Sequence, residues 1–253
     1  VALLFPLLMG GLAALFPPKR AWPVMLACVP LLASGGVLLM AFQQAGLLRW
    51  QWEIAGLILA LRLNGLSVLL LLTTQCIVVA AALYTPGHFR LTEPGPLARW
   101  LWPLMGVALS ALSLIWLATD LLTLYIALEL MGLAAVGMLM LSGKAPALLA
   151  GMRYLLLALV GSLTYLLGVA LVLGHWGRLD LQGLAEVIEP GPVAWFAAAL
   201  IGAGLALKAA LFPLHAWLTP VHENAWTPVS ALHAGLVIKA SLFMLLQLWS
   251  ILL

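Results

Sequence analysis

Three ionisable side chains lie inside long apolar stretches of this sequence. Glu129 lies within ATDLLTLYIALELMGLAAVGMLML, Lys208 within AAALIGAGLALKAALF, and Lys239 within ALHAGLVIKASLFMLLQLW. A charged side chain at the centre of a bilayer costs about 2.5 to 3.5 kcal/mol on insertion scales, so such residues usually face a partner or water and mark an ion path. These three residues therefore predict a chain that moves protons or cations.

Glu129 also has a purely structural interpretation, as a protonated carboxyl group that joins two helices. Two bases and one acid at depth can offset one another's desolvation, whereas a lone buried charge shifts its pKa and becomes neutral. The two lysines thus favour the ion path. Asp120 lies nine residues earlier and projects from the opposite helix face. We interpret it mainly as a carboxylate at a helix start, near the membrane boundary.

Pro213 follows Lys208 by five residues. Proline lacks the backbone N–H that a helix needs at this position, so the helix is expected to break or kink just beyond the lysine. Broken helices recur at ion sites in transporters, because irregular backbone at membrane depth must line a cavity or be covered by protein. A simple proline kink is the alternative, since prolines are common in membrane helices.

Three histidines cluster around this break: His215, His222 and His233. Their spacings of seven and eleven residues match no standard zinc pattern, so we predict no metal site. Histidine titrates nearest neutral pH, which favours a proton relay. His233 and Lys239 project about 120° apart on a regular helix, so water would have to connect them. We expect no bound cofactor in this chain.

The composition describes an integral membrane protein. Hydrophobic residues make up 65% of the chain and charged residues only 8%, against about a quarter charged in soluble domains. A bilayer crossing needs about 20 apolar residues. We predict an all-α, polytopic fold of about eight transmembrane helices with a broken seventh helix, at residues 1–16, 22–42, 62–84, 98–117, 119–141, 147–173, 193–213 and 228–251.

The basic residues divide unequally between the two sides of such a bundle, and they are too scattered for a nucleic-acid surface. Lys and Arg accumulate on the cytoplasmic side. The larger group therefore places the N-terminus outside and the protein in a bacterial-type inner membrane or an equivalent energy-coupling membrane. We expect a loop at 85–96 and a short surface helix within HWGRLDLQGLAEVIEPGP. The cytoplasmic group is Lys19, Arg20, Arg90, Arg99, Lys144 and Arg153, and the opposite group is Arg49, Arg62 and Arg178.

Two long motifs resemble a known family. DLLTLYIALELMG surrounds Glu129, and LKAALFPLHAWLTPVHENAWTPVSALHAGLVIKA contains Lys208 and Lys239. Both are similar to the antiporter-like proton-translocating subunits of respiratory complex I, Mrp-type sodium/proton antiporters and membrane-bound hydrogenases. The resemblance implies that Glu129 pairs with Lys208 on a discontinuous helix, and that His233 and Lys239 carry protons onward.

The resemblance also implies a division of the chain. Residues 1–97 would hold the first three helices, and residues 98–253 would form one antiporter-type half-channel. Family members usually continue into a second inverted copy, so a second half, in a longer chain or in a partner, is expected. Other membrane subunits, and soluble redox subunits, are the partners implied.

Three functions share these motifs. The first is a proton pump driven by NADH or other redox chemistry in partner subunits, the second an Mrp-type sodium/proton antiporter, and the third a membrane scaffold of an inorganic-carbon uptake complex. A structural bundle without transport has no reason to bury a Glu and two Lys. The sequence contains no flavin, iron–sulfur or quinone motif, so any catalytic label would belong to the complex.

Overall fold

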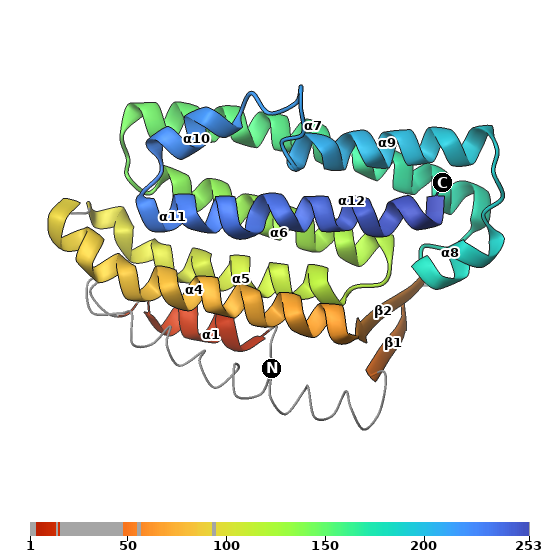
Figure 1. Ribbon diagram of the computed structural model, residues 1–253, viewed down its shortest axis with the longest axis horizontal. Coiled ribbons are helices and arrows are strands. Elements are labelled where there is room, and N and C mark those ends of the chain that lie inside the picture. The colour runs from red at the N-terminus through yellow and green to blue at the C-terminus, as the bar shows by residue number, and fades with distance from the viewer. Residues whose placement is uncertain (1–3, 14, 16–47, 55–56, 93–94, 253) are drawn as a thin grey trace.

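The computed structural model of the chain describes residues 4–13, 15, 48–54, 57–92 and 95–252. Its elements are α1 (Leu4–Ala13), β1 (Leu48–Ile54), β2 (Leu57–Leu63), α4 (Gly65–Thr92), a 3-10 turn (Pro96–Trp100), α5 (Leu101–Leu117), α6 (Leu121–Met140), α7 (Ala145–Trp176), α8 (Leu181–Val187), α9 (Pro192–Lys208), α10 (Leu218–Asn224), α11 (Thr227–Leu232), a π-helical turn (His233–Val237) and α12 (Ile238–Leu252). The long helices lie side by side (Figure 1).

Five helical segments of the described chain are long and apolar enough to cross a membrane: Gly65–Arg90, Pro96–Leu117, Leu121–Met140, Ala145–Trp176 and Thr227–Trp249. Pro192–Lys208 is a shorter apolar helix. The chain is therefore mostly helical and polytopic, as the sequence predicts. The run at 22–42, with Lys19 and Arg20, lies outside the described residues, so the number of eight helices stays a prediction.

A β-hairpin departs from the all-α prediction. β1 and β2 pair antiparallel, with Leu48 opposite Leu63 and Ile54 opposite Leu57. The segment LRWQWEI alternates apolar and polar residues with a period of two and contains two tryptophans, which favours a strand. The hairpin takes up the start of the span predicted at 62–84, whose helix begins only at Gly65.

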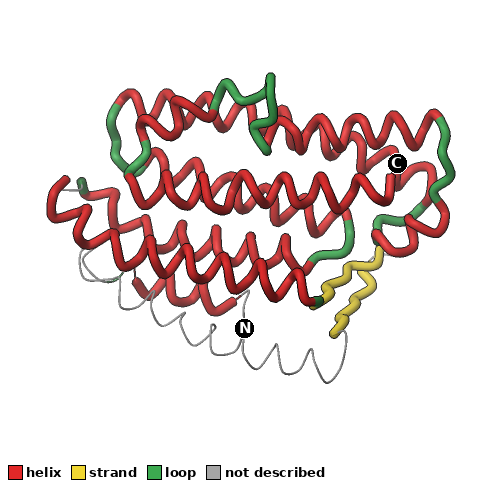
Figure 2. The backbone as a smooth tube through the Cα atoms, in the orientation of Figure 1, coloured by secondary structure: helices red, strands yellow, loops and turns green. Residues whose placement is uncertain are grey.

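The loop predicted at 85–96 is also largely helical, because α4 continues to Thr92 with Pro86 inside it. The Thr85 hydroxyl, one residue before this proline, donates to the carbonyl of Ala81 at 2.7 Å and is thus satisfied within the helix. In Figure 2 the strands and the links that join α5 to α6 and α7 to α8 gather at one end of the bundle.

That end is held together by backbone hydrogen bonds around Asp120. Its carboxylate caps α6 by accepting from the Thr123 N–H at 2.7 Å, and it also accepts from the Ala60 N–H of β2 at 3.1 Å. The prediction of a helix-start carboxylate is confirmed. Asp120 and Asp180 face each other in an isolated β-bridge. The hairpin and the two links therefore form one hydrogen-bonded layer, and α8 is the short helix predicted there.

Candidate proton-transfer site

Glu129 lies near the middle of α6, nine residues after the capping Asp120. One side of the helix packs into the core through residues such as Leu124, Ala127 and Leu128, while the Glu129 side chain keeps 27% of its surface exposed. A carboxylate at this position sits well away from both helix ends. It therefore lies well inside a helix that is long and apolar enough to cross a membrane, and part of its side chain is exposed.

Lys208 is the last residue of α9, and the helix ends there rather than at Pro213. The backbone leaves the helical path at Ala210, whose φ of 52° falls in the left-handed region that few non-glycine residues adopt. The Leu207 carbonyl at this helix end accepts from the Ala210 N–H at 3.2 Å and from the Trp217 indole N–H at 3.0 Å. The predicted break is thus present, and it begins upstream of the proline.

The two charged residues form an ion pair. Lys208 Nζ lies 2.8 Å from Glu129 Oε1, and the lysine side chain is only 7% exposed. The approach is possible because glycines bring α7 and α9 together: a side-chain carbon added at Gly204 would lie 2.5 Å from the Gly161 carbonyl oxygen. Larger side chains would force the helices, and hence the lysine, away from the carboxylate.

Ser162 of α7 completes this group and was missed from the sequence. Its hydroxyl hydrogen-bonds Glu129 Oε1, the oxygen that also accepts from Lys208, and lies 2.8 Å from the Ala158 carbonyl oxygen on its own helix. Ser162 is fully buried. The available signal was a polar residue within the apolar stretch of α7, but serine and threonine are frequent in membrane helices and carry little information alone.

His233 lies in the core next to an aromatic stack. Tyr154 stacks on Trp217 with ring centroids 4.3 Å apart, and His233 approaches the same tyrosine edge-on at 6.0 Å. His233 Nδ1 lies 2.9 Å from the Val229 carbonyl oxygen. Its Nε2 is buried without a hydrogen-bond partner among the described residues. Such a buried ring nitrogen gains a partner only when water or another polar group enters the bundle beside it.

The other two histidines are dispersed. His222 Nδ1 lies 2.6 Å from the Ser230 hydroxyl, linking α10 to α11. His215 is exposed and stacks on Phe212 in the link after α9, with centroids 5.6 Å apart. Pro213 is exposed in the same link. Within the described ranges, no three His, Cys, Asp or Glu side chains converge as metal ligands.

Lys239 departs from the sequence-based expectation of a buried base. The buried face of α12 follows Ala240, Met244 and Leu248, so Lys239, one residue before the first of these, points outward. Its ammonium donates to the Ala234 carbonyl. The π-helical turn that carries Ala234 also invalidates the angle of about 120° expected between His233 and Lys239, since that angle assumed a regular helix.

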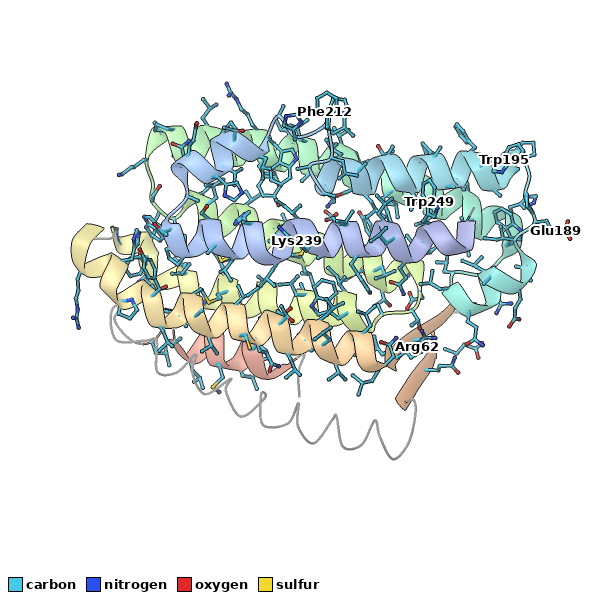
Figure 3. The ribbon with its side chains drawn as sticks, viewed as in Figure 1. Arg62, Glu189, Trp195, Phe212, Lys239 and Trp249 are labelled. Atoms are coloured by element: carbon cyan, nitrogen blue, oxygen red, sulfur yellow. The ribbon has the colours of Figure 1, made fainter. Side chains whose placement is uncertain are left out.

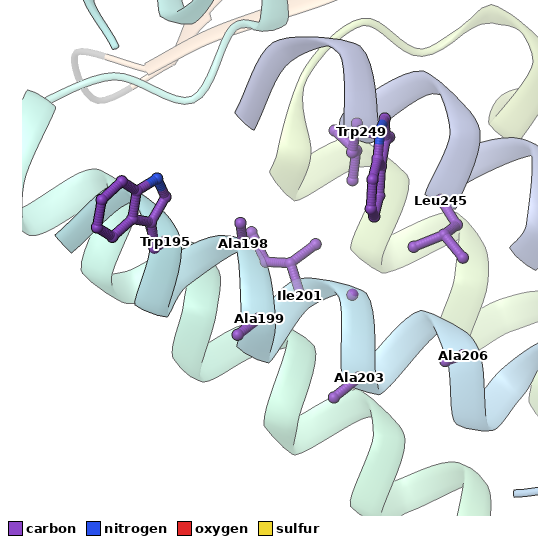
Figure 4. Close-up of a pocket in the computed structure, with 10 residues that line it drawn as sticks. Trp195, Ala198, Ala199, Ile201, Ala203, Ala206, Leu245 and Trp249 are labelled. Atoms are coloured by element: carbon purple, nitrogen blue, oxygen red, sulfur yellow. The ribbon is translucent and has the colours of Figure 1, made fainter. Parts of the chain in front are cut away.

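Two cavities flank α12. One, of about 500 Å³, lies against α4 and is lined partly by Arg62 and Lys239. In Figure 3, Arg62 lies at the end of the bundle near the hairpin, and Lys239 lies nearer its middle. The other, of about 400 Å³, lies between α9 and α12, with Trp195 and Trp249 on its walls (Figure 4). The second cavity has no ionisable lining residue, so it offers no group for proton transfer.

The fold and the ion pair define a polytopic membrane protein in which a buried lysine at a broken helix pairs with a partly buried carboxylate. The family described as the transmembrane segment of NADH:quinone oxidoreductase and Mrp antiporters matches residues 118–253, more than half of the chain. The chain belongs to this family. The resemblance inferred from the two sequence motifs is thereby confirmed.

Curated relatives and solved structures agree with this assignment. NADH-quinone oxidoreductase subunit N of Desulforudis audaxviator (strain MP104C) is 31% identical over 216 residues, which cover 81% of this chain and 41% of that relative. The same subunit of Cereibacter sphaeroides (strain ATCC 17025 / ATH 2.4.3) is 36% identical over 208 residues, covering 75% and 44%. The chain thus spans less than half the length of these relatives.

The fold is shared with a solved Mrp complex from Dietzia sp. DQ12-45-1b, at a TM-score of 0.82 and 22% identity, over 99% of this chain and 48% of that chain. It is also shared with the membrane-bound sulfane sulfur reductase, an archaeal respiratory membrane complex, at a TM-score of 0.81 and 23% identity, over 96% and 51%. At these identities the likeness concerns the fold alone.

Proposed function

We propose that this chain is a proton-translocating membrane subunit of a multi-subunit complex. The observation that carries the proposal is the 2.8 Å contact between Lys208 and Glu129 at the end of a broken helix. A buried lysine beside a carboxylate holds its proton more tightly than a lysine that has lost that partner. Movement of the pair can therefore load and release a proton.

Opening the ion pair changes the proton affinity of Lys208 enough to load and release a proton. With an effective dielectric constant of about 20, opening the pair from about 4 to about 8 Å lowers the attraction from about 4 to about 2 kcal/mol. That difference corresponds to roughly a thirtyfold change in the proton affinity of the ammonium group. Glu129 and Lys208 are the residues that we assign to this step. We assign His233, with its free Nε2 in the core, and Lys239 to onward transfer.

We further propose that redox chemistry in partner subunits drives the transfer. Curated relatives above 30% identity are NADH-quinone oxidoreductase subunits. Their similarity supports the redox-driven pump over the sodium/proton antiporter and the carbon-uptake scaffold. The cofactors for that chemistry would belong to the partner subunits, some of them soluble.

A membrane partner is supported by the link after α9. Phe212 is 87% exposed there and projects from the side of the bundle (Figure 3). Lipid cannot satisfy the peptide groups of irregular backbone, so such segments are covered by protein or line water. We therefore infer that another membrane subunit packs beside this link. Mass spectrometry of the complex purified in mild detergent should find such a subunit, and purification of the chain alone would contradict the inference.

The orientation and the organisation remain parts of the proposal. The antiparallel helices put Arg90, Arg99 and Lys144 at one end of the bundle and Arg62 and Arg178 at the other. We keep eight spans in an energy-coupling inner membrane as part of the proposal, and with the positive-inside rule this grouping supports an N-terminus outside. Residues 98–253 would then form one half-channel beside the helices of residues 1–97.

The test is proton movement in vesicles that contain the native complex. Lys208→Ala and Glu129→Ala should each abolish redox-driven proton uptake while the complex remains assembled. Lys144→Ala removes an exposed loop lysine and serves as the matched control, with uptake unchanged. Normal uptake in either site variant would refute the proposal. Transport driven by a sodium gradient without any redox substrate would identify the antiporter instead.

A further inference from the structure

The hydroxyl of Ser162 lies between the carboxylate of Glu129 and a backbone carbonyl. Its Oγ hydrogen-bonds Glu129 Oε1 on α6 and lies 2.8 Å from the Ala158 carbonyl oxygen on α7. A serine hydroxyl has one hydrogen to donate and two lone pairs with which to accept. It can therefore donate to only one of these two oxygens at a time. Which one receives the hydrogen depends on the protonation of Glu129.

The hydrogen bond between Ser162 and the Glu129 carboxyl group can be kept in both protonation states of Glu129. When Glu129 is ionised, Ser162 donates to Oε1, and the same oxygen accepts from Lys208. When Glu129 is protonated, its own O–H can donate to Ser162 Oγ, and the serine hydrogen turns to the Ala158 carbonyl. Buried polar groups left without partners are costly, so this two-way hydroxyl lets the carboxyl group change charge without moving.

We propose that Ser162 is a positioning residue for proton transfer, which holds the Glu129 carboxyl group in place in both of its protonation states. The inference deepens the proposed function and rests on it. The ion pair alone cannot do this, because a neutral Glu129 loses the charge–charge attraction to the Lys208 ammonium and keeps only a weaker hydrogen bond. Ser162 keeps the carboxyl group at the site while the lysine is released, so that the pair can form again. It does not itself carry the transferred proton.

Removal of the hydroxyl should change the pH dependence of transport. Ser162→Ala deletes a donor to the ionised carboxylate, and loss of such a bond favours the protonated form. A hydrogen bond to a charged group is strong enough that the pH of half-maximal proton uptake should rise by about one unit. Ser162→Thr keeps the hydroxyl and should restore the original profile. Ser162→Cys donates more weakly and should give an intermediate shift.

Thr164 supplies the matched control. Its hydroxyl donates to the Val160 carbonyl at 2.8 Å, the same bond to the residue four positions earlier that Ser162 can make, but it is not bonded to a carboxylate. Thr164→Ala therefore removes an equivalent helix bond from α7. Its pH profile should match that of the unmodified complex. A shift of the same size in this variant would overturn the proposal, because it would assign the effect to the helix and not to Glu129.

Infrared difference spectroscopy gives a readout that does not depend on transport. The band of the protonated Glu129 carboxyl group, identified by its loss in Glu129→Gln, should change frequency and appear at higher pH in Ser162→Ala. An unchanged band and an unchanged pH profile, in a complex that Glu129→Gln inactivates, would refute the role of Ser162 and leave the proposed function intact. Full activity of Glu129→Gln would instead refute the proposed function. If the Ser162→Ala complex fails to assemble, the pH profiles of Ser162→Cys and Ser162→Thr are compared instead, and only the Cys variant should be shifted.

Discussion

Lys208 Nζ and Glu129 Oε1 lie 2.8 Å apart although the two residues are separated by 79 positions in the chain. Three helices cooperate to produce this contact. α6 presents the carboxylate, α9 ends at the lysine, and α7 lies between them with Ser162 on the same oxygen. The contact is thus a property of helix packing, and disturbing either charge or packing should reveal what the pair does.

Removing the charges one at a time and together separates stability from transport. Glu129→Gln or Lys208→Met alone leaves an uncompensated charge in the bundle, which typically costs about 3 to 5 kcal/mol. The double variant removes both charges and should recover most of that loss. Proton uptake should stay absent in all three variants. Thermal unfolding in detergent and uptake in vesicles measure the two quantities.

An uptake rate restored together with stability in the double variant would contradict this prediction. It would mean that the pair only holds α6 and α9 together. A double variant as unstable as the single ones would show that neither charge is compensated by the other. The cycle is informative because the two side chains meet directly, and direct contacts produce the largest departures from additivity.

The close approach of α7 and α9 should affect stability and proton uptake as strongly as the two charges do. A side-chain carbon at Gly204 would meet the Gly161 carbonyl oxygen at 2.5 Å and the Tyr165 backbone nitrogen at 2.8 Å. Gly204→Ala should therefore destabilise the protein by about 1 to 3 kcal/mol, as overpacking usually does. It should also reduce proton uptake, because Lys208 lies one turn further along α9.

Gly174→Ala is the control for this substitution. Gly174 lies in α7 as well, and an added side-chain carbon there would meet nothing within 4 Å. Its unfolding temperature should stay unchanged or rise slightly, because alanine is the better helix former. Equal losses in the Gly174 and Gly204 variants would indicate a general effect of helix substitution and would count against the packing argument.

Much of this site was predictable from the sequence, because ionisable residues in apolar runs stand out. Glu129 and Lys208 were identified in that way, and the resemblance to known motifs implied their pairing. Ser162 could not be identified, since a hydroxyl in a membrane helix has many possible partners. The outward position of Lys239 was also hidden, because it depends on which face of α12 packs inward and on the π-helical turn before it.

The hairpin is a different case, because its signal was present. LRWQWEI alternates strictly, but the following strand, LILALRL, is almost entirely apolar, and its last two residues were included in the next predicted membrane span. Short apolar runs cannot be assigned to helix or strand from periodicity alone. Pairing with β1 decides the outcome, together with two further hydrogen bonds: the Ala60 N–H donates to Asp120, and the Ala60 carbonyl accepts from the Thr119 N–H. Contacts of this kind are visible only in the fold.

The layer at that end of the bundle should give the protein a measurable sensitivity to acid. Burial by itself raises the pKa of Asp180, but the hydrogen bonds from Arg178 and the Gly183 N–H outweigh it and hold the pKa below its ordinary value of 3.8. Asp180 caps α8 and accepts two bonds from the Arg178 guanidinium, at 2.9 and 3.0 Å. A carboxylate with a lowered pKa stabilises the fold above its ordinary pKa, and this contribution is lost as the pH falls through the lowered value.

Thermal unfolding in detergent between neutral pH and about pH 2 should therefore show a fall in the unfolding temperature below about pH 4. Asp180→Asn keeps one acceptor for the cap but has no charge, so it should be less stable at neutral pH and lose this part of the acid sensitivity. Glu189→Gln removes an exposed carboxylate at the same end of the bundle (Figure 3). This variant should keep the acid sensitivity of the unmodified protein. An Asp180→Asn protein with an unchanged acid profile would assign the sensitivity to other carboxylates. In that case the Arg178–Asp180 pair would contribute little to stability, as is usual for ion pairs whose arginine is about a third exposed.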